Sequence, residues 1–218
     1  MTAVLREMAM IEKVEETAAD IAWMRRLAEE GAAAPMQGAS ILMAAGVLYG
    51  AASLFQWAVM AGLLPFATQD ALSIGWIAAT LLFLVVLAVV IARLKRQPGV
   101  VTTANRASGI AWSAMGWGIF ALFTSFAVVG YRLGEAASLA MIGLVPSIIM
   151  VFYGIGWTVS AVMQKSRPLW TLSIGSYVAA PVLAAFTGEP VQYLAYAAAL
   201  FLLMALPGFL LMRAAKRA

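Results

Sequence analysis

Six long apolar segments constrain this chain more than any other feature of its sequence. Each has about 19 to 24 residues without Asp, Glu, Lys or Arg, enough for a helix to cross about 30 Å of hydrocarbon. Continuous apolar runs exclude the alternating strands of an outer-membrane barrel. The sequence therefore predicts an all-α integral membrane protein with six transmembrane helices, whose spans cover residues 40–63, 71–92, 108–130, 139–162, 169–187 and 191–212.

The composition of the chain restricts its chemistry. Only 11% of the residues are charged, where a soluble domain has about a quarter. The chain has no Cys, which excludes disulfides, thiol catalysis and thiolate metal sites, and it has no His. The commonest metal ligand and near-neutral acid–base group is therefore missing. We expect neither a metal nor a cofactor.

Lys and Arg are distributed unevenly over the ends of the spans. Thirteen of the 14 lie before the first span, between the second and third, between the fourth and fifth, or after the sixth. Because Lys and Arg are retained in the cytoplasm, both termini are predicted to be cytoplasmic. Short loops predict three antiparallel hairpins, and the signal-less chain suits a bacterial inner membrane. The loop between the first two hairpins is then a cytoplasmic anchor, and its cations are Arg93, Lys95, Arg96 and Arg106.

Three acids occupy the opposite loops, one in each. Asp70, Glu135 and Glu189 stand where the second, fourth and sixth spans begin. A ring of carboxylates that collects cations is one interpretation. We prefer helix capping, because an acid at a helix N-terminus meets free N–H groups and the positive end of the dipole.

The first 35 residues differ from the rest. They predict a cytoplasmic amphipathic helix and an Ala/Gly/Pro linker, followed by the membrane domain over residues 36–218. With four cations and seven acids, this segment is repelled by anionic headgroups. Three alternatives stay open: the helix folds under the bundle, pairs with a copy or another protein, or is mobile. Its apolar stripe consists of Val4, Met8, Ile11, Val14, Ala18, Ile21 and Ala28.

Small residues and prolines lie inside the spans. Pairs such as Gly46 and Gly50, or Gly109 and Ser113, let helices approach closely, either within the chain or across a homodimer. Each proline is expected to kink its helix and to leave one carbonyl free for a neighbour or a ligand. These prolines are Pro146, Pro181 and Pro207.

Aromatic residues recur about eight or nine positions from the cytoplasmic end of five spans. That depth lies near the bilayer centre, whereas aromatics usually gather at the interfaces. They are candidates for lining a pocket for an apolar or aromatic ligand; filling of the core or contact with lipid is the alternative. Ser113, Ser147 and Thr80 lie at nearby depths as partners for the hydroxyls. The candidate residues are Tyr49, Phe83, Trp117, Tyr153 and Tyr177.

The uncharged spans narrow the function. Buried ionisable groups mark proton relays and voltage sensors, so their absence argues against pumps, proton-coupled antiporters and most intramembrane enzymes. We expect a non-catalytic regulatory, sensory or scaffolding component that acts through helix contacts. The alternative is a transporter or channel for an uncharged or lipophilic small molecule, and a lipid-modifying enzyme is a third hypothesis. The expected partners are the lipid bilayer and, through the N-terminal helix, a second copy or a membrane protein; no nucleic acid is expected.

Overall fold

The computed structural model describes residues 13, 17, 19–24, 38–64, 69–96, 102–215 and 217. The chain divides into two compact units, Met1–Ala34 and Pro35–Ala218. In the first unit Lys13, Thr17 and residues 19–24 are helical, and the Thr17 hydroxyl donates to the Lys13 carbonyl at 2.7 Å. Most of the apolar stripe expected in this segment, including Val4, Met8, Ile11 and Val14, lies outside the described residues.

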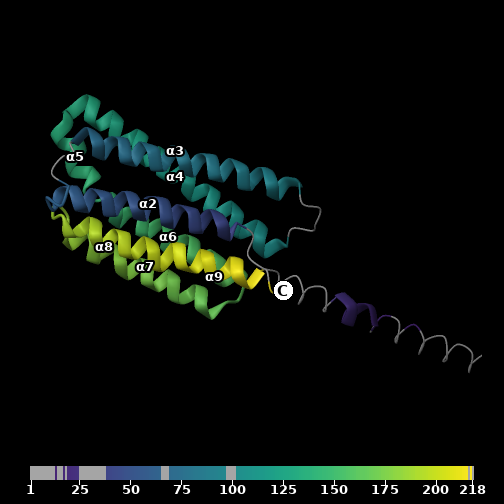
Figure 1. The fold of residues 1–218 in the computed structure, drawn as a ribbon. Helices are drawn as coiled ribbons and strands as arrows, with labels where there is room; N and C mark the ends of the chain where they lie inside the picture. Colours follow the sequence, from purple (N-terminus) through teal and green to yellow (C-terminus); the bar gives the residue numbers. More distant parts are fainter. Residues whose placement is uncertain are drawn as a thin grey trace, which may run out of the picture. The chain divides into compact units, whose positions relative to one another are not determined.

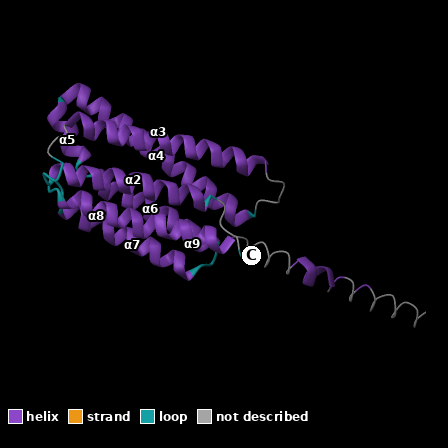
Figure 2. Cartoon of the chain, viewed as in Figure 1, coloured by secondary structure: helices purple, strands orange, loops and turns teal. Residues whose placement is uncertain are grey.

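The second unit consists of helices joined by turns over its described residues (Figures 1 and 2). Within the described residues, six helices are long and apolar enough to cross a membrane, which confirms the all-α class and the number of such helices expected. The last of these six combines three consecutive segments. The elements are α2 (Ala39–Met60), α3 (Gln69–Arg96), α4 (Thr103–Leu133), α5 (Glu135–Ile142), α6 (Val145–Met163), α7 (Arg167–Ala185), α8 (Val191–Leu200), the π-helix η1 (Phe201–Ala205) and α9 (Leu206–Ala215).

Helices α3 and α4 extend beyond the apolar segments that predicted them. α3 continues to Arg96, so three cations lie in its last turn, at the negative end of the helix dipole. α4 begins at Thr103, and the hydroxyl of the preceding Thr102 accepts the N–H of Asn105 at 3.2 Å. Such a cap stabilises a helix start by about 1 kcal/mol. Hydropathy marks only the part of a helix that crosses hydrocarbon, so it misses these polar ends.

Residues 139–162, expected to form one continuous span, belong to two helices. α5 ends at Ile142, residues 143 and 144 form a turn, and α6 begins at Val145. Pro146 therefore lies in the first turn of α6, where its missing N–H breaks no helical bond. The expected kink at Pro146 is thus wrong, whereas Pro181 does lie inside α7.

A π-helical turn precedes the third proline. Pro207 has no N–H to offer the carbonyl of Leu203, four residues earlier. The indole N–H of Trp157, a residue with no exposed surface, donates to that carbonyl at 3.1 Å. The expectation that a proline leaves a carbonyl for a neighbouring helix is confirmed here.

Helices α2, α6, α7 and α8–η1 contribute the hydrophobic core of the second unit. α3 packs on α2 and α4 packs on α6, and both outer helices stay largely exposed (Figure 1). α7 packs chiefly along α6, while α8, η1 and α9 pack chiefly along α2. The last two spans are therefore not each other's main partners. Core residues include Leu42, Met150, Trp157, Leu183, Leu200 and Met204.

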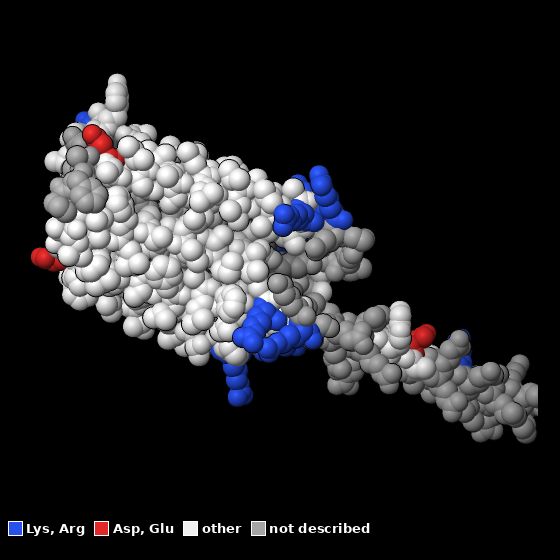
Figure 3. Space-filling view, in the orientation of Figure 1, with Lys and Arg blue, Asp and Glu red and all other residues white. Residues whose placement is uncertain are grey.

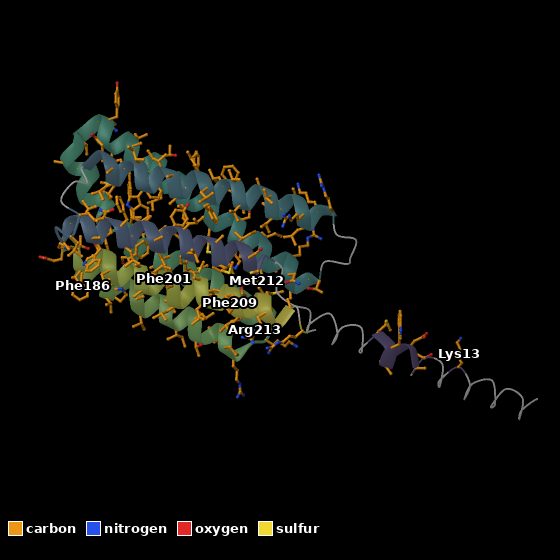
Figure 4. The ribbon with its side chains drawn as sticks, in the orientation of Figure 1. Lys13, Phe186, Phe201, Phe209, Met212 and Arg213 are labelled. Carbon is orange, nitrogen blue, oxygen red and sulfur yellow. The ribbon has the colours of Figure 1, made fainter. Side chains whose placement is uncertain are left out.

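Glycines bring α2 close to the last span. A Cβ on Gly46 would lie 2.3 Å from the backbone nitrogen of Ala205, and a Cβ on Gly208 would lie 2.5 Å from that of Met43. Gly50 faces the ring of Phe201, which Figure 4 labels. The face carrying Gly46 and Gly50 is thus occupied inside the chain, so of the two alternatives for this pair the structure supports packing within the chain.

Charged side chains collect at the two ends of the second unit (Figure 3). The basic end contains the last turn of α3, the start of α4 and the turn between α6 and α7. At the other end Asp70 lies in the first turn of α3, near the positive end of the helix dipole. Glu189 does not cap α8 with its side chain; its backbone carbonyl accepts the N–H of Gln192 at 3.0 Å.

Candidate functional site

A first aromatic group joins α2 to α3. The ring centroid of Tyr49 lies 5.5 Å from that of Phe83 and 6.4 Å from that of Trp76. Trp76, Thr80 and Phe83 share one face of α3, because residues three and four apart are neighbours on a helix. The Thr80 hydroxyl, one of the partners expected for the tyrosines, donates instead to the carbonyl of Trp76 at 2.9 Å. The Trp76 indole N–H donates to the side-chain oxygen of Gln56.

A second aromatic group joins α4 to α6. The ring centroid of Trp112 on α4 lies 5.9 Å from that of Tyr153 and 5.3 Å from that of Trp157, both on α6. The Trp112 indole N–H donates to the Ser160 hydroxyl at 3.2 Å. Ring contacts of this kind stabilise by about 0.5–1.5 kcal/mol beyond the area they bury. The group therefore fixes the otherwise exposed α4 to the core.

The two aromatic groups adjoin in the interior. Tyr153 is 8% exposed and Tyr196, on α8, is 5% exposed. Both tyrosines belong to one buried cluster, and Tyr49 and Trp76 of the first group and Trp112 of the second pack against it. Of the five candidate residues, the structure thus links Tyr49, Phe83 and Tyr153 through neighbouring contacts.

Trp117 and Tyr177 lie elsewhere. Trp117 is 71% exposed, and its ring contacts only Phe120 of its own helix among the ring pairs described, at 6.1 Å. Tyr177 is 41% exposed; its ring covers Gly154, and its hydroxyl lies 3.4 Å from the Thr158 hydroxyl. Trp117 thus lies on the outer face of α4, whereas Tyr177 packs against α6 and stays partly exposed. The five candidates therefore do not form one layer around a common interior, and a ligand-binding role for them stays a prediction.

Buried hydroxyls in the core donate to backbone carbonyls. Ser53 donates to Tyr193 and Ser147 to Ala180, each at 2.7 Å. Ser147 was expected to be a hydrogen-bond partner of a tyrosine, but its hydroxyl instead joins α6 to α7 through the Ala180 carbonyl. Carbonyls that accept from neighbouring helices hold the bundle together without charge.

The charged side chains lie outside the described core. No Asp, Glu, Lys or Arg is buried among the described residues. The same part of the chain contains no cluster of three or more His, Cys, Asp or Glu side chains suited to a metal ion. What the described core offers a partner or ligand is aromatic surface and hydrogen bonds.

A shallow, largely open depression of about 450 Å³ lies on the outer surface of α4. It includes Trp117 but neither Tyr153 nor Tyr177, so it is a groove along one helix and not a path through the bundle. Ser113, the third hydroxyl expected near the tyrosines, lies in it. We call it the α4 groove; its lining residues are Asn105, Arg106, Gly109, Ile110, Ser113, Ala114 and Trp117.

Several contributors to these contacts were not found from the sequence. Counting depth selected one aromatic residue per span and passed over Trp76, Trp112, Trp157 and Tyr196. Helical spacing was the available signal, since Tyr153 and Trp157 lie four residues apart on one face of α6. Nothing in the sequence marked Gln192 as a buried hydrogen-bonding residue, because glutamine is common at the ends of membrane spans.

No protein-family model matches this chain, and no curated protein or solved structure matches it either. Its function is therefore inferred from its own residues. Two features are candidates: the packed core with its aromatic groups, and the α4 groove on the outer face.

Proposed function

We propose that this protein is a non-catalytic membrane component that acts through helix contacts, in a regulatory, sensory or scaffolding role. The packed core carries the proposal. Tyr153, Trp157 and Tyr196 belong to one buried cluster, and Trp157 and Ser160 have no exposed surface. A core tied by glycine contacts and carbonyl hydrogen bonds suits a protein that presents surfaces to others.

The segment 1–35 is the proposed contact region for a partner. Its predicted apolar stripe favours contact with another apolar surface, and its net negative charge disfavours an anionic membrane surface. A partner helix from a second copy or from another membrane protein satisfies both requirements.

The test compares the full-length protein with a variant that lacks residues 2–30. Blue native electrophoresis and cross-linking in native membranes report the assembly in each case. We expect the truncated protein to lose a larger assembly while its bundle keeps its unfolding temperature. A full-length control with Lys13→Ser and Thr17→Ser, both at exposed positions, should keep the assembly. Retention of every interaction by the truncated protein contradicts the proposal.

The proposed location is the inner membrane of a bacterium, with both termini in the cytoplasm. The gathering of Lys and Arg at one end of the bundle supports this orientation (Figure 3). Arg132, near the end of α4, is the exception at the opposite end.

A transporter or channel for an uncharged or lipophilic molecule is the second candidate. The adjoining aromatic groups around Tyr49 and Tyr153 favour it, because aromatic surface binds apolar solutes. The α4 groove gives it less support, since one helix lines the groove and the buried tyrosines are not part of it. Uptake of a neutral aromatic solute by proteoliposomes, abolished by Tyr153→Ala, would favour transport over the contact role.

A further inference from the structure

The α4 groove has a positively charged residue at one end and apolar residues along the rest of its length. Arg106 lies in its first part, near the start of α4, and its side chain is exposed. Ile110, Ala114 and Trp117 continue the groove as apolar surface. A Cβ on Gly109 would meet nothing within 4 Å, so the missing side chain leaves space in the groove.

The length of the groove matches one leaflet of a bilayer. Arg106 and Trp117 are separated by eleven residues, or about 16 Å along a helix. Half of a hydrocarbon core of about 30 Å is about 15 Å. A chain that follows the groove from Arg106 would therefore end near the bilayer centre, beside the ring of Trp117.

The charge of the groove selects its occupant. Arg106 lies at the basic end of the bundle, where the last turn of α3 also carries Arg93, Lys95 and Arg96 (Figure 3). A second copy docked here in the same orientation would bring its own Arg106 toward this one, which repulsion disfavours. An anionic headgroup gains from the same cations, by about 1 kcal/mol for each one near the surface.

We propose that the α4 groove is a binding site for an anionic phospholipid. One acyl chain lies over Gly109 and Ser113 and contacts Trp117, and Arg106 binds the phosphate. A guanidinium is suited to this role, because its donors match the geometry of phosphate oxygens. The exposed faces of α3 and α4 are thereby unequal: α4 holds a lipid in place, whereas α3 has an ordinary apolar surface.

Native mass spectrometry of the full-length protein tests the site, with phosphatidylglycerol and phosphatidylcholine as the two probes. We expect phosphatidylglycerol to bind more tightly, and Arg106→Gln to weaken its binding by about fivefold. Arg132→Gln is the matched control, because it removes the same charge at the other end of the bundle. It should leave phosphatidylglycerol binding unchanged.

A second pair of variants tests the apolar part of the groove. Gly109→Leu fills the space over the helix and should weaken phosphatidylglycerol binding, whereas Ala78→Leu at an exposed position of α3 should not. An unchanged unfolding temperature shows that each variant is folded. Equal binding by Arg106→Gln and Arg132→Gln overturns the proposal, as does equal affinity for both lipids. Loss of a dimer by Gly109→Leu with unchanged lipid binding also overturns it and assigns the groove to a second copy.

Discussion

At the scale of single residues, Gln192 and Gln164 place the same side chain in opposite situations. Gln192 is 1% exposed, and its Nε2 donates to the carbonyls of Gly143 and Leu183 at 2.8 and 3.1 Å. These bonds tie the start of α8 to the turn before α6 and to the end of α7. Gln192→Leu removes both donors from a buried place, so we expect it to lower the free energy of unfolding by about 1–3 kcal/mol.

Gln164→Leu is the matched control. Among the described residues, its Nε2 is buried without a hydrogen-bond partner. Replacing an unsatisfied buried amide by an apolar group is close to neutral or stabilising, so the free energy of unfolding should stay the same or rise. Tryptophan fluorescence during thermal unfolding in one detergent compares the two variants. An equal fall in the free energy of unfolding for both variants would show that the hydrogen bonds of Gln192 do not contribute to stability.

At the scale of helices, the sequence predicts which segments become helices better than it predicts their partners. A span depends on the hydropathy of its own residues, so all six apolar segments were found. A partner depends on which face a residue occupies. Trp112 and Trp117 are five residues apart, about 140° around the helix, and only Trp112 faces α6. Depth counting placed Trp117 in the aromatic layer because it ignores this angle.

The packing of α2 against the last span also belongs to this scale. Gly46→Ala would place a Cβ 2.3 Å from the backbone nitrogen of Ala205, which cannot move without shifting η1. We expect the free energy of unfolding to fall by about 1–3 kcal/mol. Gly116→Ala on α4 is the control, since its Cβ would meet nothing within 4 Å. It should be neutral, or stabilising by about 0.5–1 kcal/mol through helix propensity.

Unfolding by titration with dodecyl sulfate measures both glycine variants in mixed micelles. A larger loss for Gly46→Ala than for Gly116→Ala is the expected order. Equal losses would show that the close contact between α2 and η1 does not limit stability. The same comparison bears on oligomerisation. If the Gly46 face of α2 is packed inside the chain, a second copy cannot bind to it.

At the scale of the whole molecule, charge and packing follow separate patterns. The core is held by contacts that need no charge, such as the bond from Trp157 to the carbonyl of Leu203. The charges lie at the ends of the helices, with most cations at one end (Figure 3). Substitution of an end charge should therefore change orientation in the membrane more than stability, since exposed charges contribute little to folding.

Single cysteines test that orientation, because the natural chain contains none. Tyr131→Cys and Thr187→Cys lie at exposed positions at the acidic end, and Lys165→Cys lies in the turn between α6 and α7 at the basic end. The positive-inside rule predicts that a membrane-impermeant maleimide labels positions 131 and 187 in intact cells. Position 165 should react only after the membrane is permeabilised. The reverse pattern would place the cations of α3 and α4 outside the cell and would contradict the proposed cytoplasmic termini.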